Sequence, residues 1–395
     1  MVYVNTNRPV GHPGLAWSST GRTNRFDVSC CAPVCKPISI DTRMDKVSHK
    51  RPYTMRDVAR LAGVSVATVS AVVNGRQVVR PVVVTKVQEA MKALNFHPDH
   101  VARSLRVKKT TTLGVVVPDF SSGFFVDVLR GIEDVARSVG YSVLLCNSDD
   151  DVEQEQRHLG ALLSRRVDGI LLASTDLYAV ADTQLRSGAP IVLFDRVPPG
   201  YRGAAVVVDN VDAAYRATAH LIELGHRSVA FIAGRLDLST ASDRAEGFRR
   251  AMEDAHLPLN GAYFKRGDYH PESGYQNGLE LLRLPQPPTA IVCSNGLMTL
   301  GLLRAVHELH VTCPDQVSII GFDEPAPDTY GFSLSTLLRP ELTVVAQPGH
   351  EVGQQAAQTL LRILSDTDPL SAEPFVITLK AELRVRKSTG PPSAS

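Results

Sequence analysis

Residues 54–75 constrain the fold of this 395-residue chain most, because they encode two short helices around a glycine turn. Thr54 is placed to cap the first helix, and Asp57, three residues on, completes a capping box. Gly63 supplies the turn, and Ser65 caps a second helix that ends near residue 75. Two helices in this arrangement form a helix-turn-helix, whose second helix carries a face of small side chains that fits the major groove of DNA.

An αα-hairpin inside an unrelated helical domain is the alternative to this interpretation. The residues that follow favour the helix-turn-helix, because Pro81 begins a third helix with apolar residues at helical spacing. This third helix completes a small three-helix core. Its predicted buried face consists of Val83, Val84, Val87, Met91 and Leu94.

Charge is divided unevenly along the chain, although the net charge is only +1. Residues 45–112 carry 13 lysines and arginines against 4 acidic residues, whereas residues 113–395 carry 24 against 35. A basic head on an acidic body indicates a module that binds a polyanion, joined to a part that binds a different ligand.

The six cysteines are scattered and predict a reducing, cytoplasmic compartment. Three of them form a Cys-Cys-x-x-x-Cys segment at Cys30, Cys31 and Cys35. This segment has no histidine nearby and no paired Cys-x-x-Cys, which argues against a zinc site. We therefore expect no metal and no cofactor.

Residues 1–50 are rich in proline, serine, threonine, asparagine and arginine and show no periodicity. They also lack the apolar core of a signal peptide, so we expect a disordered N-terminal extension. Nowhere does the chain contain 18 consecutive uncharged apolar residues, and we expect no membrane span and no membrane partner.

After residue 112 the pattern changes to short apolar runs that alternate with helical patterns. The run at 113–117 is continuous, as in a strand that is buried on both faces. A first βα series extends to residue 194, and a second begins at 205–208 and continues to a strand at 317–322. Two such series predict an α/β body of two parallel-sheet lobes, with a ligand bound between them at the carboxyl ends of the strands.

Two other classes of protein could contain such a body. A dinucleotide-dependent enzyme is disfavoured, because no strand leads into Gly-x-Gly-x-x-Gly and neither a Gly-x-x-x-x-Gly-Lys loop nor a Gly-x-Ser-x-Gly elbow is present. We expect no enzymatic activity. A periplasmic sugar-binding protein would share the two lobes, but it would need a signal peptide and would have no use for residues 54–106.

The chain resembles the LacI/GalR (lactose-repressor) family of bacterial transcription regulators from about residue 52 to about residue 389. In the head, the matching motifs are Thr-x-x-Asp-Val-Ala-x-x-Ala-Gly-Val-Ser from residue 54, Thr-Val-Ser at 68–70, Asn-Gly at 74–75 and Ala-Arg-Ser-Leu at 102–105. In the body, they include Phe-Asp-Arg at 194–196, Arg-x-x-Gly-Phe at 244–248 and Gly-Phe-Asp at 321–323. The resemblance implies a cytoplasmic, nucleoid-associated homodimer that represses transcription from a double-stranded DNA operator under control of a small effector, such as a sugar.

The same resemblance implies the domain boundaries. The head spans 52–107, with a hinge helix at 99–106, and the body spans 112–389, followed by a tail at 390–395. Because three strands cross between the lobes in this family, we expect crossings near residues 209, 345 and 374. The first lobe is then about 112–208 and 346–373, and the second about 209–344 and 375–388. Family members usually begin near the position of Met44, so residues 1–43 are expected to be a mis-called start.

The resemblance also assigns the residues that contact DNA. Side chains expected on the phosphate backbone are Thr54, Ser65, Thr68, Ser70 and Asn74, and those expected at base edges are Val66, Ala67 and Ala71. In the hinge, with Ala102 and Arg103, Leu105 holds the position of a leucine that wedges into the minor groove. The chain departs from the family at Ala71, where arginine is common. Alanine cannot grip a guanine, although its methyl group can touch a thymine methyl.

Sugar recognition needs charged and amide groups that bridge adjacent hydroxyls, and an apolar wall for the C–H face of the ring. By resemblance, the effector site consists of Phe124, Phe125, Asp195, Arg244, Tyr269, Asn295 and Asp323. Here too the chain departs from the family, because Ser122-Gly123 replaces the usual Asn-Pro and Gly296 replaces an aspartate.

Overall fold

The computed structural model describes residues 53–73, 79–96, 109–174, 176, 180, 183–184, 188–324, 333–365 and 375–393. The chain divides into two compact units, residues 1–98 and residues 99–395, called the head and the body below. The expected disordered extension at 1–50 and the expected hinge helix at 99–106 lie outside the described residues. Among the described residues, no helix has the length and apolar character that crossing a membrane requires.

Among its described residues, the head contains three helices: α1 (Met55–Ala62), α2 (Val66–Val73) and α3 (Pro81–Ala93). The Asp57 carboxylate accepts hydrogen bonds from both the main-chain N–H (2.9 Å) and the hydroxyl (2.7 Å) of Thr54, which fixes the start of α1. Gly63 ends α1 with φ of 67°, a left-handed conformation that glycine adopts at little cost. The predicted three-helix core is present, with Val58, Val69 and Val87 fully buried at its centre.

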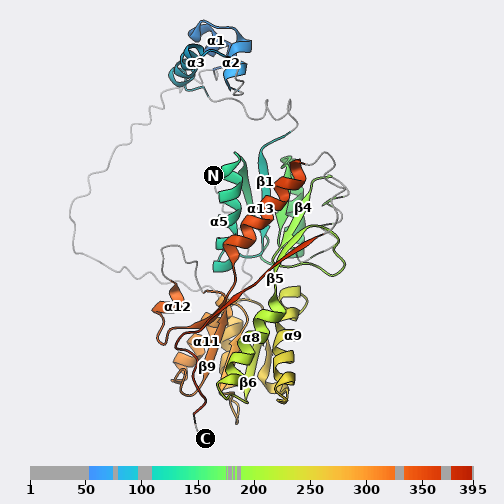
Figure 1. Ribbon diagram of the computed structural model, residues 1–395, viewed down its shortest axis with the longest axis vertical. Coiled ribbons are helices and arrows are strands. Elements are labelled where there is room, and N and C mark those ends of the chain that lie inside the picture. The colour runs from blue at the N-terminus through green and yellow to red at the C-terminus, as the bar shows by residue number, and fades with distance from the viewer. Residues whose placement is uncertain are drawn as a thin grey trace, which may run out of the picture. The chain divides into compact units, whose positions relative to one another are not determined.

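The body contains two six-stranded sheets, one in each lobe (Figure 1). In spatial order, the first sheet is β11 (Val376–Leu379), β5 (Ala205–Val208), β4 (Ile191–Phe194), β3 (Gly169–Leu172), β1 (Thr112–Val117) and β2 (Ser142–Asn147). The second is β12 (Glu382–Arg384), β10 (Thr343–Ala346), β9 (Ser318–Phe322), β8 (Ala290–Cys293), β6 (Val229–Ala233) and β7 (Phe264–Arg266). Every neighbouring pair is parallel except β10 and β12. The inner strands β3, β4, β6, β8 and β9 are buried along their whole length, because helices cover both faces of each sheet.

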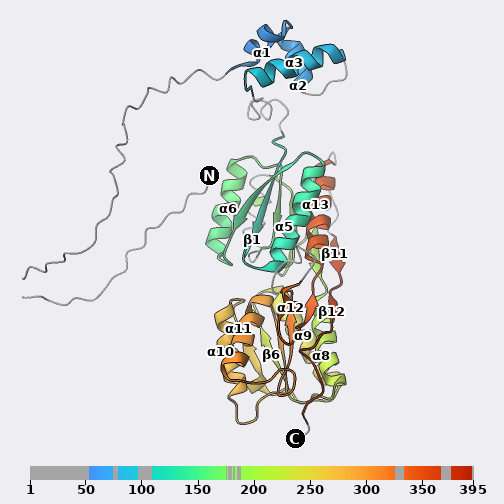
Figure 2. The same ribbon diagram turned by 90° about the vertical axis from the view of Figure 1, so that its left-hand side faces the viewer.

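Helices cover the first sheet on both faces. Those that the structure describes are α5 (Gly123–Ser138), α6 (Val152–Ser164) and α13 (Gly349–Ser365). Figure 2 shows α5 and α13 side by side, with α6 on the opposite face. The two helices approach so closely that a Cβ atom added to Gly131 would lie 2.0 Å from the main-chain oxygen of His350.

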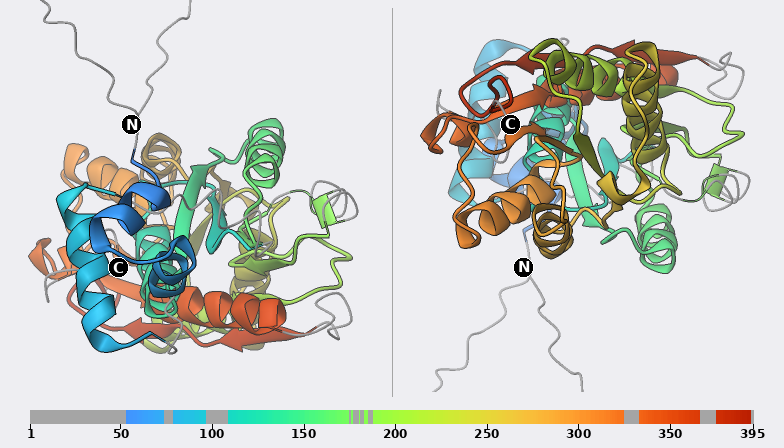
Figure 3. Two further views of the ribbon diagram at one scale, coloured as in Figure 1. Left: turned by 90° about the horizontal axis from the view of Figure 1, so that it is seen from above. Right: turned by 90° about the horizontal axis from the view of Figure 1, so that it is seen from below.

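Helices cover the second sheet in the same way. They are α8 (Asn210–Glu223), α9 (Ser239–Asp254), α10 (Pro271–Leu282) and α11 (Gly296–Glu308), with a short 3-10 helix (Gly261–Tyr263) and α12 (Leu334–Leu337). Seen from below in Figure 3, α8 and α9 lie on one face of this sheet, and α10 and α11 lie on the other.

In the part of the body that the structure describes, three segments cross between the lobes, and two of them lie near their predicted positions. The first follows β5 and the second follows β10. The third was predicted near residue 374, which is wrong, because β11 still pairs with β5 in the first sheet and the crossing falls at Lys380 and Ala381. β11 adds to the outer edge of β5 as a parallel strand. Just after β11, Arg216 Nη2 donates to the main-chain oxygen of Ala381 at 2.6 Å, which fixes the chain where it crosses. Residues 376–379 therefore belong to the first lobe and not to the second, where they were expected. The strand at 205–208, which begins the second βα series of the sequence, lies in the first lobe, within the predicted boundary at about residue 208.

The segment predicted as a tail from residue 390 is also bound to the second lobe. The main-chain N–H of Gly390 donates to Ser318 Oγ at 3.1 Å, and its carbonyl oxygen lies 2.9 Å from His226 Nε2. His226 is fully buried and also bonds Thr289 Oγ1 at 2.9 Å. Polar groups buried at this depth need partners, and the C-terminal segment supplies them.

Candidate functional site

In the head, α2 has an inward face and an outward face. Val69 is fully buried, with Val72 and Val73 packed beside it, whereas Val66 is 43% exposed and Ala67 is exposed. At its N-terminus, Ser65 Oγ accepts from the main-chain N–H of Thr68 at 3.1 Å and lies 2.8 Å from the Thr68 hydroxyl. Four residues predicted to contact DNA lie outside the described residues, namely Asn74, Ala102, Arg103 and Leu105.

In the body, one cavity of about 120 Å³ lies where the carboxyl ends of the strands of the two sheets face each other. Residues from both lobes line it. The structure brings together at this cavity all of the residues predicted for the effector site: Phe124, Phe125, Asp195, Arg244, Tyr269, Asn295 and Asp323.

Two aspartates occupy matching positions in the two lobes. Asp195 directly follows β4 and Asp323 directly follows β9, and β4 and β9 have the same place in the spatial order of their sheets. Both residues have φ of 65°, and Tyr269 in the same cavity has φ of 71°. Residues other than glycine adopt this left-handed backbone conformation at a cost, and residues in such conformations cluster at ligand sites.

Arg244 of α9 is held rigidly in the cavity wall. Its Nε donates to Asn210 Oδ1 at 2.7 Å, its Nη1 donates to Ser294 Oγ at 3.3 Å, and its guanidinium lies 4.4 Å from the ring centre of Phe322. Arg244 is only 3% exposed, and within the described parts of the chain its Nη2 has no protein partner. A planar fork that is fixed in this way can donate to two neighbouring oxygens of a ligand.

Asp323 faces this arginine and is held from the other side by Gln347. Gln347 Nε2 donates to Asp323 Oδ1 at 2.6 Å, while the buried Oε1 of Gln347 has no hydrogen-bond partner in the part of the chain that the structure describes. Burial raises the pKa of Asp323, and the nearby charge of Arg244 opposes that shift. A buried acceptor without a partner is uncommon in proteins, and here it borders the cavity.

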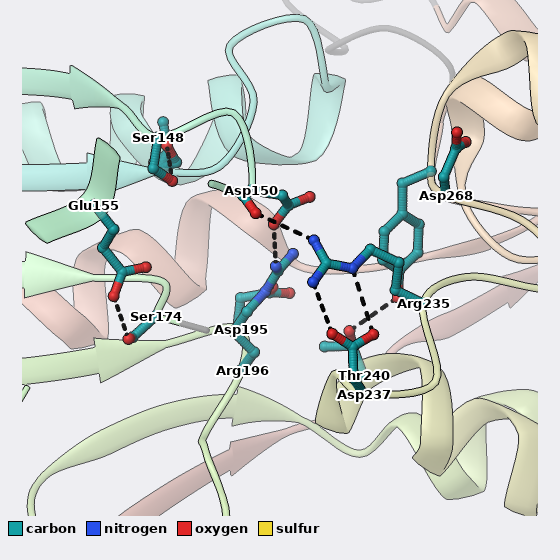
Figure 4. Close-up of polar contacts among 12 residues, drawn as sticks. Ser148, Asp150, Glu155, Ser174, Asp195, Arg196, Arg235, Asp237, Thr240 and Asp268 are labelled. Carbon is teal, nitrogen blue, oxygen red and sulfur yellow. Dashed lines mark hydrogen bonds and ion pairs between the residues drawn. The ribbon is translucent and has the colours of Figure 1, made fainter. Parts of the chain in front are cut away.

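Arg196 forms a buried cluster with two carboxylates (Figure 4). Its Nη1 lies 2.6 Å from Asp150 Oδ1 and its Nε lies 3.0 Å from Asp195 Oδ2. Burial alone would lower the pKa of Arg196, but the charges of Asp195 and Asp150 outweigh burial and raise the pKa above its ordinary value. The positive charge of Arg196 is therefore neutralised within the protein.

Hydrogen bonds also join the two lobes at the rim of the cavity. Arg235 follows β6 in the second lobe, and its Nη1 donates to the main-chain oxygen of Asp150 in the first lobe at 3.1 Å. The main-chain N–H of Val197 in the first lobe donates to Ser239 Oγ at the start of α9, also at 3.1 Å. The lobes are thus connected by side chains as well as by the three crossing segments.

Several residues that line the cavity were not predicted from the sequence. They include Asp119, Asp149, Asp150, Arg196, Thr240 and Gln347. Position in the chain is the signal that could have found some of them. Asp119 lies two residues after β1 and Gln347 directly follows β10, so both lie at carboxyl ends of strands, where this architecture binds ligands. Within the described ranges, no group of three or more His, Cys, Asp or Glu side chains could hold a metal ion.

Comparison with known families matches both units of the chain. Residues 54–99 match the family described as bacterial regulatory proteins, lacI family. Residues 110–381 match the family described as periplasmic binding proteins and sugar binding domain of the LacI family.

Individual proteins are similar over most of their length. Catabolite control protein A of Priestia megaterium is 35% identical over 338 residues, which cover 85% of this chain and 99% of the relative. The HTH-type transcriptional repressor PurR of Glaesserella parasuis serovar 5 (strain SH0165) is 35% identical over 340 residues, covering 85% and 98%. A solved structure, the lac repressor dimer bound to operator and the anti-inducer ONPF, superposes with a TM-score of 0.75 at 27% identity, covering 86% of this chain and all of that one.

Proposed function

The chain belongs to the LacI family of DNA-binding transcriptional repressors, and from that membership we propose that an uncharged polyhydroxylated effector binds between the lobes and controls operator affinity. The observation that supports this proposal most is the convergence of both lobes on one cavity. Phe124 and Asp195 come from the first lobe, and Arg244, Asn295 and Asp323 come from the second. A ligand that touches all of them must favour one arrangement of the lobes over others, which is the requirement for a switch.

The type of polar group in the cavity fits a sugar. Arg244 Nη2, which has no partner among the described residues, can donate, and the carboxylate of Asp323 can accept, so a pair of neighbouring hydroxyls can bond both side chains at once. Phe124 and Phe125 supply an apolar wall and contact each other edge to face, with ring centres 5.2 Å apart. A wall of this kind suits the C–H face of a sugar ring.

The charges in the cavity argue against an anionic effector. Five aspartates line it against two arginines, and Arg196 already pairs with two of those aspartates. Arg244 is the remaining cation, and it faces the carboxylate of Asp323. A phosphate or carboxylate on the ligand would lie among uncompensated negative charges, and burying a charge without a partner is costly. We therefore propose a neutral sugar rather than a phosphorylated one.

For DNA binding we propose a homodimer in the cytoplasm that recognises a roughly palindromic operator. One helix-turn-helix covers only a half-site, so two heads are needed for a site of useful length. Thr54, Ser65, Thr68, Ser70 and Asn74 would contact phosphates. Leu105, with Ala102 and Arg103, would form the hinge contact in the minor groove.

The proposal is tested with an operator selected from random duplex DNA by the full-length protein. Operator affinity is measured by fluorescence anisotropy with neutral monosaccharides and disaccharides, and with the phosphate ester of each sugar. We expect at least one neutral sugar to change operator affinity and its phosphate to have no effect. A response to the phosphate alone would contradict the proposed neutral effector. Failure to select any DNA site at moderate salt would contradict operator binding itself.

A further inference from the structure

The side chains of α2 are unusual for a helix that reads DNA. Its sequence from Val66 to Val73 is Val-Ala-Thr-Val-Ser-Ala-Val-Val, which contains no charged and no amide side chain. Guanine is most often read by a bidentate arginine or lysine, and adenine by a bidentate asparagine or glutamine. This helix can make none of those contacts.

The Thr68 hydroxyl of α2 already has a partner within the protein. Thr68 Oγ1 bonds Ser65 Oγ, and the main-chain N–H of Thr68 donates to the same Ser65 oxygen. Ser70 has an interaction within the molecule as well. The outward face of α2 therefore presents chiefly methyl groups.

The positions of these methyl groups match those that reach base edges. In a helix-turn-helix, the N-terminal residues of the second helix contact the bases. Val66 and Ala67 are the first two residues of α2 and are both exposed, and the half-buried Ala71 follows one turn after Ala67 on the same side of the helix. The core-facing residue Val69 is fully buried and lies on the side of α2 opposite Ala67 and Ala71.

Each base pair has one apolar group in the major groove, the 5-methyl group of thymine. We propose that α2 reads its half-site through thymine methyl groups, which pack against Val66, Ala67 and Ala71, and not through hydrogen bonds to guanine or adenine. This inference rests on the proposed DNA-binding function and concerns α2 alone. It predicts thymines at the base pairs that α2 covers.

The test changes one chemical group of the DNA at a time. It uses a duplex selected from a random library by the full-length protein, with affinity measured by fluorescence anisotropy. Each thymine of one half-site is replaced in turn by deoxyuridine, which lacks only the 5-methyl group. Each guanine is replaced in turn by 7-deazaguanine, which lacks the N7 acceptor. At the base pairs under α2, we expect each lost methyl group to weaken binding about fourfold and the lost N7 to have no effect.

A variant identifies which base pairs lie under α2. Val66→Ala removes two methyl groups and keeps a good helix former, so the head remains folded. It should weaken binding to the selected site. At the thymine that Val66 touches, replacing thymine by deoxyuridine should weaken binding less in this variant than in the parent protein, and a double-mutant cycle measures the difference. Val82→Ala is the matched control, because Val82 is 69% exposed and lies at the start of α3. It should leave affinity for every duplex unchanged.

Two results would overturn the inference. One is equal affinity for every deoxyuridine duplex, and the other is a loss with 7-deazaguanine that couples to Val66→Ala. Failure to select any site would instead count against DNA binding as a whole, so the two failures are distinguishable.

Discussion

Arg235, in the second lobe, donates a hydrogen bond of 3.1 Å to the main-chain oxygen of Asp150, in the first lobe. Asp237 orients the guanidinium from the other side through a 2.7 Å contact (Figure 4). The side chain of Asp150 is in turn paired with Arg196, which also holds Asp195 in the cavity wall. The interlobe bond is thus continuous with the cluster that shapes the proposed effector site.

We predict that Arg235→Ala weakens effector binding about fivefold, the effect of losing one hydrogen bond. The variant favours a more open arrangement of the lobes, from which closing around a ligand costs more free energy. Isothermal titration with a sugar that acts on the parent protein measures the change. Arg250→Ala is the control, because Arg250 is 56% exposed and pairs with Glu246 on the surface of α9. Parent-like sugar affinity in Arg235→Ala would show that this bond does not contribute to closure.

A second prediction concerns the stability of the protein at acid pH. Burial lowers the pKa of His226 below its ordinary value of 6.5. As the pH falls below 6.5, the unfolded chain takes up a proton on this residue before the folded protein does, so the free energy of unfolding decreases. At higher pH this contribution to stability is fully present. Urea unfolding at pH 7 and pH 5 should show the loss, and it should be smaller in His226→Gln than in the parent.

The control for this prediction is His307→Gln, which alters an exposed histidine of α11. It should keep the pH dependence of the parent. If the free energy of unfolding falls by the same amount between pH 7 and pH 5 in His226→Gln and in the parent, His226 is excluded as a cause of acid sensitivity.

A third prediction compares two glycines in helices of the first lobe. Gly131→Ala forces α5 and α13 apart, because its new Cβ atom would lie 2.0 Å from His350 O, and we expect a loss of about 1–3 kcal/mol in the free energy of unfolding. Gly160 in α6 has no atom within 4 Å of such a Cβ position. Gly160→Ala should therefore stabilise the protein by about 0.5–1 kcal/mol. Urea unfolding of both variants checks the pair, and equal effects would contradict the close approach of the helices.

The inner strands could be predicted from the sequence because they are buried on both faces and therefore read as continuous apolar runs. The runs at Gly169–Leu172, Ala205–Val208 and Ala290–Cys293 have the bounds that the sequence indicates. The edge strands β11 and β12 could not be predicted in this way, because they are short and alternate between exposed and half-buried residues. Which sheet β11 joins is decided by its pairing with β5, about 170 residues away, and nothing local in the sequence encodes that choice.

The same distinction applies to the cavity. Asp195 and Asp323 could be predicted because each directly follows an apolar strand. Arg196 and Gln347 were missed, because their roles depend on partners far along the chain: Asp150, 46 residues from Arg196, and Asp323, 24 residues from Gln347.

The last prediction tests the cavity as the switch. Asp323→Asn keeps the shape of the side chain and removes the charge that accepts from a ligand hydroxyl, and Arg244→Ala removes the fixed donor fork. Each variant should lose roughly 2 kcal/mol of effector binding, about thirtyfold, because hydrogen bonds to charged groups are among the stronger ones. Operator affinity without effector should remain that of the parent, since neither residue lies in the head. Operator titrations with and without the active sugar measure both quantities, with Arg250→Ala as a control on the same helix. If both variants respond to the sugar as the parent does, the effector binds elsewhere.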